Sequence, residues 1–324
     1  MSNAQRTAVI LLQMGGPATL DDIRPFLRNL LSDPAILAVP AFVRLPLARF
    51  IAWRRAPHVA LQYAAIGGGS PIGPHTARQA IALRASLAAA GRPMPVHVAM
   101  RYVKPRAASV LQKIAADGVE RLVLLPLYPQ HSRTTTDSSL DEVRDLLARF
   151  HPQIQPVEVT DWADHPGYVA ALARTVEQAL AQVPANIRER TRILFSAHGL
   201  PLRYVEAGDP YPSQVAQTVA AVMSRLGSDA PSAVTCYQSR VGPVKWLTPS
   251  TEQAIRTAAA EHIAALVVVP VAFVSDHIET LYEIEVTYRE QAREAGIETF
   301  VRVPALNDSP ELAAALAEIV ISAL

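Results

Sequence analysis

Between residues 266 and 271 the chain reads LVVVPV, an uncharged and mostly β-branched run that predicts a strand buried on both faces. Strands of this kind belong to parallel sheets that are covered by helices. The next segment, SDHIETLYEIE (275–285), is acidic and carries a histidine. Because open α/β sheets bind their ligands at the carboxyl ends of the strands, we expect this segment to lie at a functional edge.

A helix that starts near Ser275 would place Asp276, Glu279 and Glu283 on one face, with His277 beside them. Such a face can carry protons or hold a divalent metal. On this segment alone, ordinary capping and dipole chemistry explains the same carboxylates equally well.

Two internal matches predict a duplicated fold. LVLLPL (122–127) matches LVVVPV (266–271), and ILLQMGGP (10–17) aligns with LFSAHGLP (194–201), which makes Met14 and His198 equivalent. Strands alternating with helices indicate parallel sheets, and the matches favour two sheets of four over one barrel of eight. The expected strands lie near 7–13, 94–100, 121–127, 154–159, 191–196, 232–237, 265–271 and 298–303.

We therefore predict an α/β protein with two similar Rossmann-like domains, each a four-stranded parallel sheet flanked by helices. The expected domains are residues 1–155 and 156–308, and the helix 309–324 can pack on either of them.

Composition excludes several classes of function. The 324 residues are half apolar, and the formal charge of +1 argues against a broad nucleic-acid footprint. A single cysteine, Cys236, cannot form an internal disulfide or a multi-cysteine metal site within one chain. No apolar run approaches the ~18 residues of a membrane span, so a cytoplasmic protein is expected. The loop IGGGSP (66–71) lacks the lysine and spacing of a phosphate-binding loop, which argues against a nucleotide.

Eight short motifs, in order along nearly the whole chain, resemble the ferrochelatase family, enzymes that insert ferrous iron into a porphyrin. They are MGGP (14–17), GGGSP (67–71), MRY (100–102), LYPQ (127–130), SAHGLP (196–201), QSRVGP (238–243) with Trp246, SDHIETLYE (275–283) and LNDSP (306–310). The resemblance implies a chelatase-like fold with the porphyrin between the two domains, His198 on one wall and Glu279 beyond it.

His198 and Glu279 are the candidate catalytic residues. A neutral imidazole, which titrates near ~6.5, suits a base that removes the pyrrole protons, with Glu279 as acceptor or relay. Both groups also suit Fe(II), so base and metal ligand stay open as roles for His198.

The resemblance also implies an acidic path that leads from Glu279 to Glu283 along a helix widened by a π-type turn. His277 and Glu285 are further candidates for this proton or metal path. Some relatives carry another outer carboxylate where this chain has Thr287, and Glu285 is the candidate replacement.

The candidate porphyrin contacts fall into two groups. Apolar contacts would grip a twisted ring, at a strain of ~1–5 kcal/mol, while arginines and the Ser70 loop would hold its carboxylates. The full set is Met14, Arg54, Arg55, Ser70, Arg101, Tyr102, Trp246 and Phe273.

Residues 35–55 are unusually apolar and interleaved with arginines. They suit either a core helix or an exposed lip that covers the porphyrin and touches the inner membrane surface. The expected partners are porphyrin and ferrous iron as substrates, together with transient heme-pathway enzymes. No permanently bound cofactor is expected, and the iron–sulfur cluster of animal relatives is not expected either, because the sequence has a single cysteine.

The leading functional prediction is iron insertion into protoporphyrin IX, which gives protoheme. Coproporphyrin III is the alternative substrate, and a chelatase for a cobalt or sirohydrochlorin-type substrate is more distant. From another class, a non-catalytic tetrapyrrole or metal carrier would use the same fold, but it would need neither a base nor a proton exit.

Overall fold

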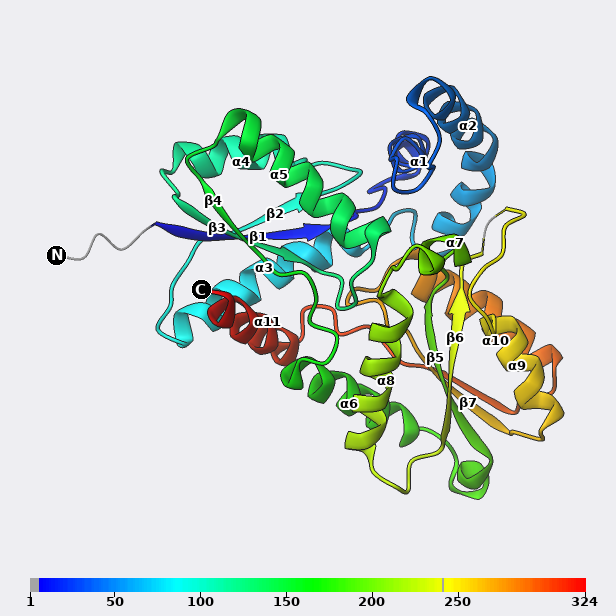
Figure 1. Cartoon of the computed structure of the whole chain (residues 1–324). Coiled ribbons are helices and arrows are strands. Elements are labelled where there is room, and N and C mark those ends of the chain that lie inside the picture. Colours follow the sequence, from blue (N-terminus) through cyan, green and yellow to red (C-terminus); the bar gives the residue numbers. More distant parts are fainter. Residues whose placement is uncertain (1–5, 241) are drawn as a thin grey trace. The chain divides into compact units, whose positions relative to one another are not determined.

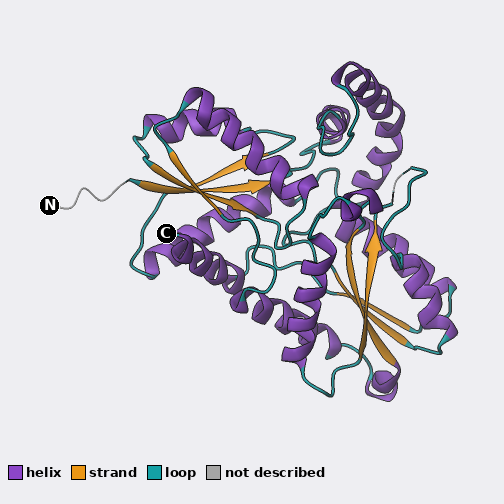
Figure 2. Ribbon diagram, in the orientation of Figure 1, coloured by secondary structure: helices purple, strands orange, loops and turns teal. Residues whose placement is uncertain are grey.

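The computed structural model describes residues 6–240 and 242–324, so Val241 of the QSRVGP motif lies outside the described residues. The chain divides into two compact units: unit 1 runs to Trp162 and includes Asp308–Leu324, and unit 2 is Ala163–Asn307. Each unit contains one sheet of four parallel strands, in the orders β2-β1-β3-β4 and β6-β5-β7-β8 (Figure 2). The predicted fold class is confirmed.

Unit 1 is built around the central strand β1, in which residues 8–12 are buried. Helices α4 and α5 cover one face of its sheet, and α3 and α11 cover the other (Figure 1). The strands are β1 (Thr7–Gln13), β2 (Val96–Met100), β3 (Arg121–Pro126) and β4 (Gln155–Glu158). The helices are η1 (Leu20–Asp22), α1 (Ile23–Leu31), α2 (Ala41–Ala65), α3 (Ile72–Ala89), α4 (Ala107–Ala116), the π-helical η2 (Arg133–Asp137), α5 (Ser138–Phe150) and α11 (Pro310–Ala323).

Unit 2 repeats this plan, with β5 in the place of β1. Its strands are β5 (Thr191–His198), β6 (Ser232–Gln238), β7 (Ala265–Val269) and β8 (Thr299–Arg302). Helices α9 and α10, with the π-helix η4, pack on one face through an apolar core that includes Ile284 and Val268, and α6 and α8 lie on the other (Figure 1). The helices are α6 (Pro166–Leu180), η3 (Ala185–Arg190), α7 (Leu202–Glu206), α8 (Tyr211–Leu226), α9 (Thr251–Ala260), η4 (Glu279–Tyr288) and α10 (Arg289–Glu294).

The division between the units differs from the expected boundary after residue 155. Strand β4 pairs with β3, and the indole Nε1 of Trp162 donates to the Pro126 carbonyl at 3.1 Å, so the chain stays with unit 1 until Trp162. The final helix α11, which the sequence left open, packs on α3 and β3 in unit 1. Among the described residues, no helix has the length and apolar character that crossing a bilayer requires.

The packing of α11 predicts where stability is lost when it is weakened. Leu316 on α11 is fully buried, so Leu316→Ala is expected to lower the free energy of unfolding by about 2–5 kcal/mol. Hydrogen exchange followed by mass spectrometry should show lost protection in β1 and β3. Val222→Ala, at a fully buried position of α8 in unit 2, is the matched control and should affect β5 and β6 instead. Equal loss of protection in both units for Leu316→Ala would contradict the assignment of α11.

Candidate functional site

His198 is the last residue of β5, one of the two inner strands of the unit 2 sheet. The next residue, Gly199, donates its N–H to the Gln238 carbonyl at 2.8 Å. A Cβ at Gly199 would lie 2.7 Å from that carbonyl oxygen and 3.2 Å from the Trp246 ring. Only glycine therefore lets the chain turn this close to β6, and the turn leaves His198 at the carboxyl edge of the sheet.

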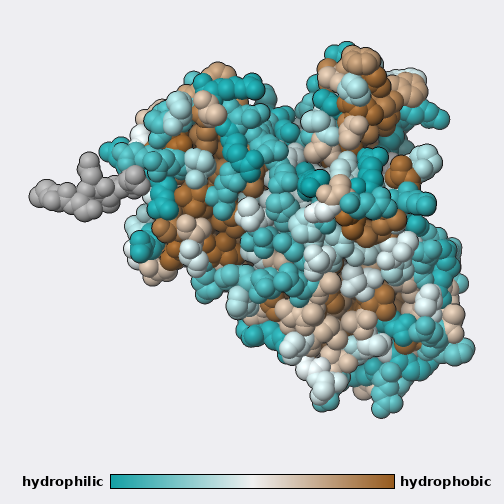
Figure 3. All heavy atoms as spheres, viewed as in Figure 1, coloured by the Kyte–Doolittle hydropathy of each residue, from teal (hydrophilic) through white to brown (hydrophobic). Residues whose placement is uncertain are grey.

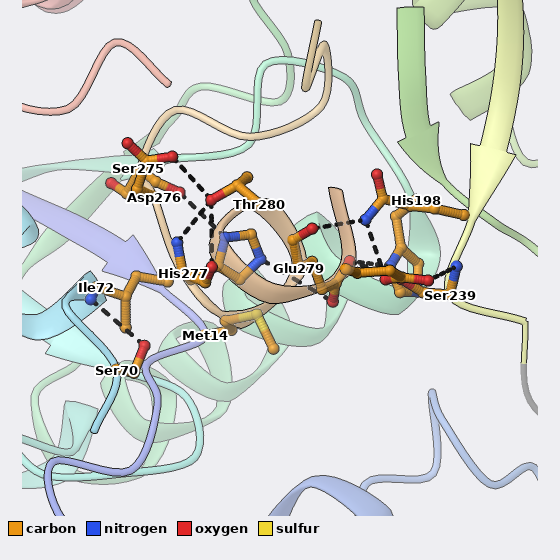
Figure 4. Close-up of polar contacts among 12 residues, drawn as sticks. Met14, Ser70, Ile72, His198, Ser239, Ser275, Asp276, His277, Glu279 and Thr280 are labelled. Atoms are coloured by element: carbon orange, nitrogen blue, oxygen red, sulfur yellow. Dashed lines mark hydrogen bonds and ion pairs between the residues drawn. The ribbon is translucent and has the colours of Figure 1, made fainter. Parts of the chain in front are cut away.

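The His198 imidazole pairs with Glu279, the first residue of η4 (Figure 4). Its Nδ1 lies 2.8 Å from Glu279 Oε2, and the two side chains are 44% and 17% exposed. An ionised carboxylate only accepts hydrogen bonds, so Nδ1 carries a proton and Nε2 is the nitrogen left for a proton or a metal. The more exposed imidazole is thus the group that a solute meets first.

Ser239 brings Glu279 and Glu283 together. Its hydroxyl lies 3.0 Å from Glu279 Oε2 and also contacts Glu283 Oε2, while its backbone N–H donates to Glu283 Oε1 at 2.9 Å. A hydroxyl has one hydrogen, so it can donate to only one of the two carboxylates at a time. Ser239 has a φ of 62°, a left-handed conformation that is uncommon outside glycine and that clusters at functional sites.

Two more side chains hold Glu283. Gln238 Nε2 donates to Glu283 Oε2 at 3.1 Å and to the Glu279 carbonyl at 3.2 Å. The phenol of Tyr288 donates to Glu283 Oε1 at 2.9 Å. Both carboxylate oxygens of Glu283 therefore have neutral hydrogen-bond donors.

The pKa values of the two carboxyl groups, Glu279 and Glu283, are shifted in opposite directions. Burial raises the pKa of Glu279, but the His198 imidazole beside it, with His277 and the Ser239 hydroxyl, brings that pKa down to about 2. Burial and the charge of Glu279 raise the pKa of Glu283. Glu279 is thus the ionised member, and Glu283 is the one that takes up a proton more readily.

The pKa of His198 is raised, because of its partner Glu279. Burial is the largest single effect and lowers this pKa, but the charge and hydrogen bond of Glu279, with the charge of Glu283, together raise it above 6.5. The Glu279 carboxylate therefore makes Nε2 of His198 more basic as well as orienting the ring.

His277 lies behind this pair and is 5% exposed. Its Nδ1 donates to the Ser275 carbonyl at 3.1 Å, which leaves Nε2 without a proton when the ring is neutral. That Nε2 lies 4.0 Å from Glu279 Oε1 and has no hydrogen-bond partner among the described residues. Burial lowers the pKa of His277, so the ring stays neutral at pH 7.

Phe273 makes ring contacts with both imidazoles. Its ring centroid is 4.6 Å from that of His277 and 6.3 Å from that of His198, edge-on to the latter. An apolar ring in contact with an imidazole favours its neutral form, which is the direction in which burial shifts the pKa of both histidines.

Asp276 and Glu285 depart from their expected places. Asp276 precedes the helix instead of sharing a face with Glu279 and Glu283, and its carboxylate pairs with Arg302 at 2.8 Å. Glu285 pairs with Arg289 at 2.6 Å and with Arg302 at 3.2 Å. A carboxylate bound by two guanidinium groups is a poor cation ligand, so this arrangement disfavours Glu285 as part of an outer metal site, and that role stays a prediction. In the described part of the chain, no group of three or more His, Cys, Asp or Glu side chains is arranged so that it could hold a metal ion.

Arg101 and Tyr102 are engaged within unit 1. The Tyr102 phenol donates to Asp33 Oδ2 at 3.0 Å, and Arg101 pairs with Asp33 at 2.8 Å and with Glu142 at 3.0 Å. Tyr102 is 4% exposed. These polar groups therefore brace the loop after α1, and their contact with a porphyrin stays a prediction.

The remaining predicted contacts lie on loops and on α2. Gly69 has no room for a side chain, because a Cβ there would lie 2.1 Å from the Ala18 carbonyl oxygen, and Ser70 N–H donates to Pro17 at 2.7 Å. The glycine loop thus packs on the segment that follows Met14. Four predicted contacts remain: Arg54 is exposed, and Arg55, Met14 and Trp246 are half-buried. Their contacts with a porphyrin also stay predictions.

Three residues of the site were not assigned from the sequence. Gln238 is the last residue of β6, the strand beside β5, and Ser239 follows it, and that position was the available signal. Tyr288 lies five residues after Glu283, a spacing that brings side chains together on a π-helix and not on an α-helix.

Comparison with known proteins identifies the family of the chain. A model of the ferrochelatase family matches residues 6–324. A ferrochelatase of Cyanothece sp. is 46% identical over 98% of this chain and 83% of its own length. A ferrochelatase of Geotalea uraniireducens is 45% identical over 98% of this chain and 97% of its own length.

Among solved structures, Bacillus subtilis SirB with Fe³⁺ has a TM-score of 0.59 at 10% identity, over 98% of this chain and 96% of that one. At this identity the likeness concerns the fold alone. The match to the family model and the identity with ferrochelatases over nearly the full length lead to one conclusion: the chain belongs to the ferrochelatase family, the metal chelatases of heme biosynthesis.

Proposed function

We propose that the protein inserts Fe(II) into protoporphyrin IX to give protoheme, with His198 and Glu279 as its catalytic pair. The observation that supports this most directly is the 2.8 Å contact between the His198 imidazole and the Glu279 carboxylate at the end of a central strand. A tetrapyrrole or metal carrier would need no base that is oriented by a buried carboxylate.

Metal insertion requires that two inner N–H protons leave the porphyrin. His198 Nε2 accepts a proton, and the Glu279 carboxylate on Nδ1 stabilises the resulting imidazolium. Glu283, whose pKa is raised, is the next acceptor, and the Ser239 hydroxyl lies between the two carboxylates. His277, neutral and 4.0 Å from Glu279, lies on the same path.

Iron in this proposal is a substrate that passes through the site, with no permanently bound cofactor. Imidazole nitrogen and carboxylate oxygen both suit Fe(II), so His198 and Glu279 can hold it briefly. Phe273 supplies an apolar wall beside His198 against which a ring can be bent.

Replacement of His198 tests the base. For His198→Ala we expect kcat for iron insertion to fall by at least about 100-fold, while the porphyrin Kd stays within several-fold, because general-base catalysis contributes about 10²–10⁴. Loss of free-porphyrin fluorescence under anaerobic conditions measures this, with protoporphyrin IX and coproporphyrin III run in parallel. His262→Asn, at an exposed position with a φ of 58° that asparagine tolerates, is the control.

Each result of that experiment decides one point. Turnover of coproporphyrin III alone would replace the proposed substrate. Tight porphyrin binding without turnover of either would favour the carrier. Wild-type turnover by His198→Ala would remove His198 from the mechanism.

The ion pair also predicts the titration of His198. By NMR, the wild-type His198 imidazole should titrate with a midpoint above 6.5, because Glu279 favours its charged form. In Glu279→Gln that midpoint should fall, since burial then acts with less opposition. His277 should titrate below 6.5 in the wild-type protein and serves as the internal reference. An unchanged His198 midpoint in Glu279→Gln would show that the pair does not form in solution.

We further propose that α2 contacts the membrane surface, where porphyrins and heme partition, and that the protein meets other heme-pathway enzymes there transiently. Support comes from its large exposed side chains: Phe42 is 80%, Phe50 59% and Trp53 56% exposed. Figure 3 shows apolar residues over α2. Arg49 and Arg54 lie among them, as in interfacial helices that bind anionic lipids.

Sedimentation with anionic vesicles tests this surface. The wild-type protein should co-sediment, and Phe42→Ser with Trp53→Ser should release it, because each buried apolar side chain contributes about 1.5–3 kcal/mol. Leu61→Ser, which alters an equally exposed side chain on the same helix beyond residue 55, is the control and should still sediment. Wild-type protein that stays in the supernatant would exclude the membrane contact.

A further inference from the structure

Arg302 links two separate parts of the catalytic segment, by which we mean residues 275–285. It is the last residue of β8, an edge strand of the unit 2 sheet, and pairs in register with Val268 of β7. Its Nη1 donates to Asp276 Oδ1 at 2.8 Å, and its Nε donates to Glu285 Oε2 at 3.2 Å. The Arg302 and Asp276 side chains are 16% and 10% exposed, so this contact is largely withdrawn from solvent.

Asp276 connects Arg302 to the site through further hydrogen bonds. Its Oδ1 also accepts the Thr280 hydroxyl at 2.8 Å, and Thr280 Oγ1 accepts the His277 N–H at 3.0 Å (Figure 4). Asn307 holds the other side, donating to Asp276 Oδ2 at 2.9 Å and accepting the Asp276 N–H at 2.8 Å. The turn that carries His277 and enters the helix at Glu279 is therefore built on Asp276.

Glu285 is the second residue through which Arg302 holds this segment, and it lies within the π-helix η4. The π-helix η4 is an uncommon geometry, which other contacts must maintain. On the β6 side, Gln238 and Ser239 hold Glu283. On the β8 side, Arg302 holds Glu285. The helix is thus tied by side chains from both edge strands of the sheet, β6 and β8.

We propose that Arg302 is a positioning residue for metal insertion: by bridging Asp276 and Glu285 it fixes the start of the catalytic segment relative to its π-helix, and so orients His277 and Glu279. The inference rests on the proposed function, because insertion is the activity that this orientation serves. Arg302 acts through the two carboxylates and does not touch the reacting atoms.

The kinetic test compares three variants. Arg302→Gln keeps a polar side chain but loses the charge and the fork that reaches two carboxylates. We expect its kcat for insertion to fall at least about tenfold, with the porphyrin Kd within about threefold, since small misplacements of catalytic groups cost rate more than binding. Arg302→Lys, which can pair with one carboxylate at a time, should be intermediate. Arg289→Gln is the matched control, because it removes the other guanidinium from Glu285 and leaves Asp276 paired.

A structural role alone gives a different result. If Arg289→Gln and Arg302→Gln lose kcat equally and in proportion to their loss of Tm, or if Arg302→Gln keeps the wild-type kcat, the inference is overturned. Imidazole NMR signals give an independent readout: Arg302→Gln should shift those of His277 and His198, and Arg289→Gln should leave them in place. Unshifted signals in Arg302→Gln would also overturn it.

Different results would refute iron insertion and the positioning role of Arg302. A wild-type protein that inserts iron into neither porphyrin would refute the proposed function, while the NMR comparison would still decide whether Arg302 orients the imidazoles. A wild-type protein that turns over, with Arg302→Gln equally active, would refute the positioning role alone.

Discussion

Two carboxylates on one helix, Glu279 and Glu283, converge on the single hydroxyl of Ser239, and the organisation of the site depends on this contact. Like charges at this separation repel, so one carboxylate needs a cation and the other needs neutral donors or a proton. The His198 Nδ1–H pairs with Glu279 and the ring becomes its cation once Nε2 takes up a proton, while Gln238 and Tyr288 donate to Glu283. The pKa of Glu279 is lowered and that of Glu283 is raised, so a proton that reaches the pair is favoured on Glu283.

The two units share one fold, but the ionisable pair belongs to unit 2. Both units have the same strand order, and both continue from their third strand through a loop into a π-helical segment, η2 in unit 1 and η4 in unit 2. Counting on from the matched prolines 126 and 270, Thr135 stands where unit 2 has Glu279, and Met14 stands where it has His198. Among the described residues, the ionisable pair is thus present in one copy of the repeat, so the fold alone does not dictate it.

The strands were predictable because period and composition are local properties. All eight lie where apolar periodicity predicted them, and the repeat of LVLLPL and LVVVPV indicated two sheets. The places of His198 at the end of β5 and of Glu279 after β7 were likewise predictable, because each strand is a buried apolar run. The left-handed conformation of Ser239 was not, because it arises from contacts with Glu283 that are distant in sequence.

Competition for partners explains the other differences. Glu285 was expected on the acidic path, but Arg289 and Arg302 bind both of its oxygens. Tyr102 was expected at the porphyrin, and its hydroxyl is bonded to Asp33, a residue 69 positions earlier in the chain. Such pairings depend on which polar groups the fold brings together, and a sequence pattern carries no signal for them.

The central claim is that His198 and Glu279 act as one unit, and a double-mutant cycle on insertion tests it most directly. Single-turnover rates would be measured for the wild-type protein, His198→Ala, Glu279→Gln and the double variant. If the carboxylate works through the imidazole, the double variant will be no slower than His198→Ala alone. Losses that multiply in the double variant would show that the two residues act independently and would contradict this account.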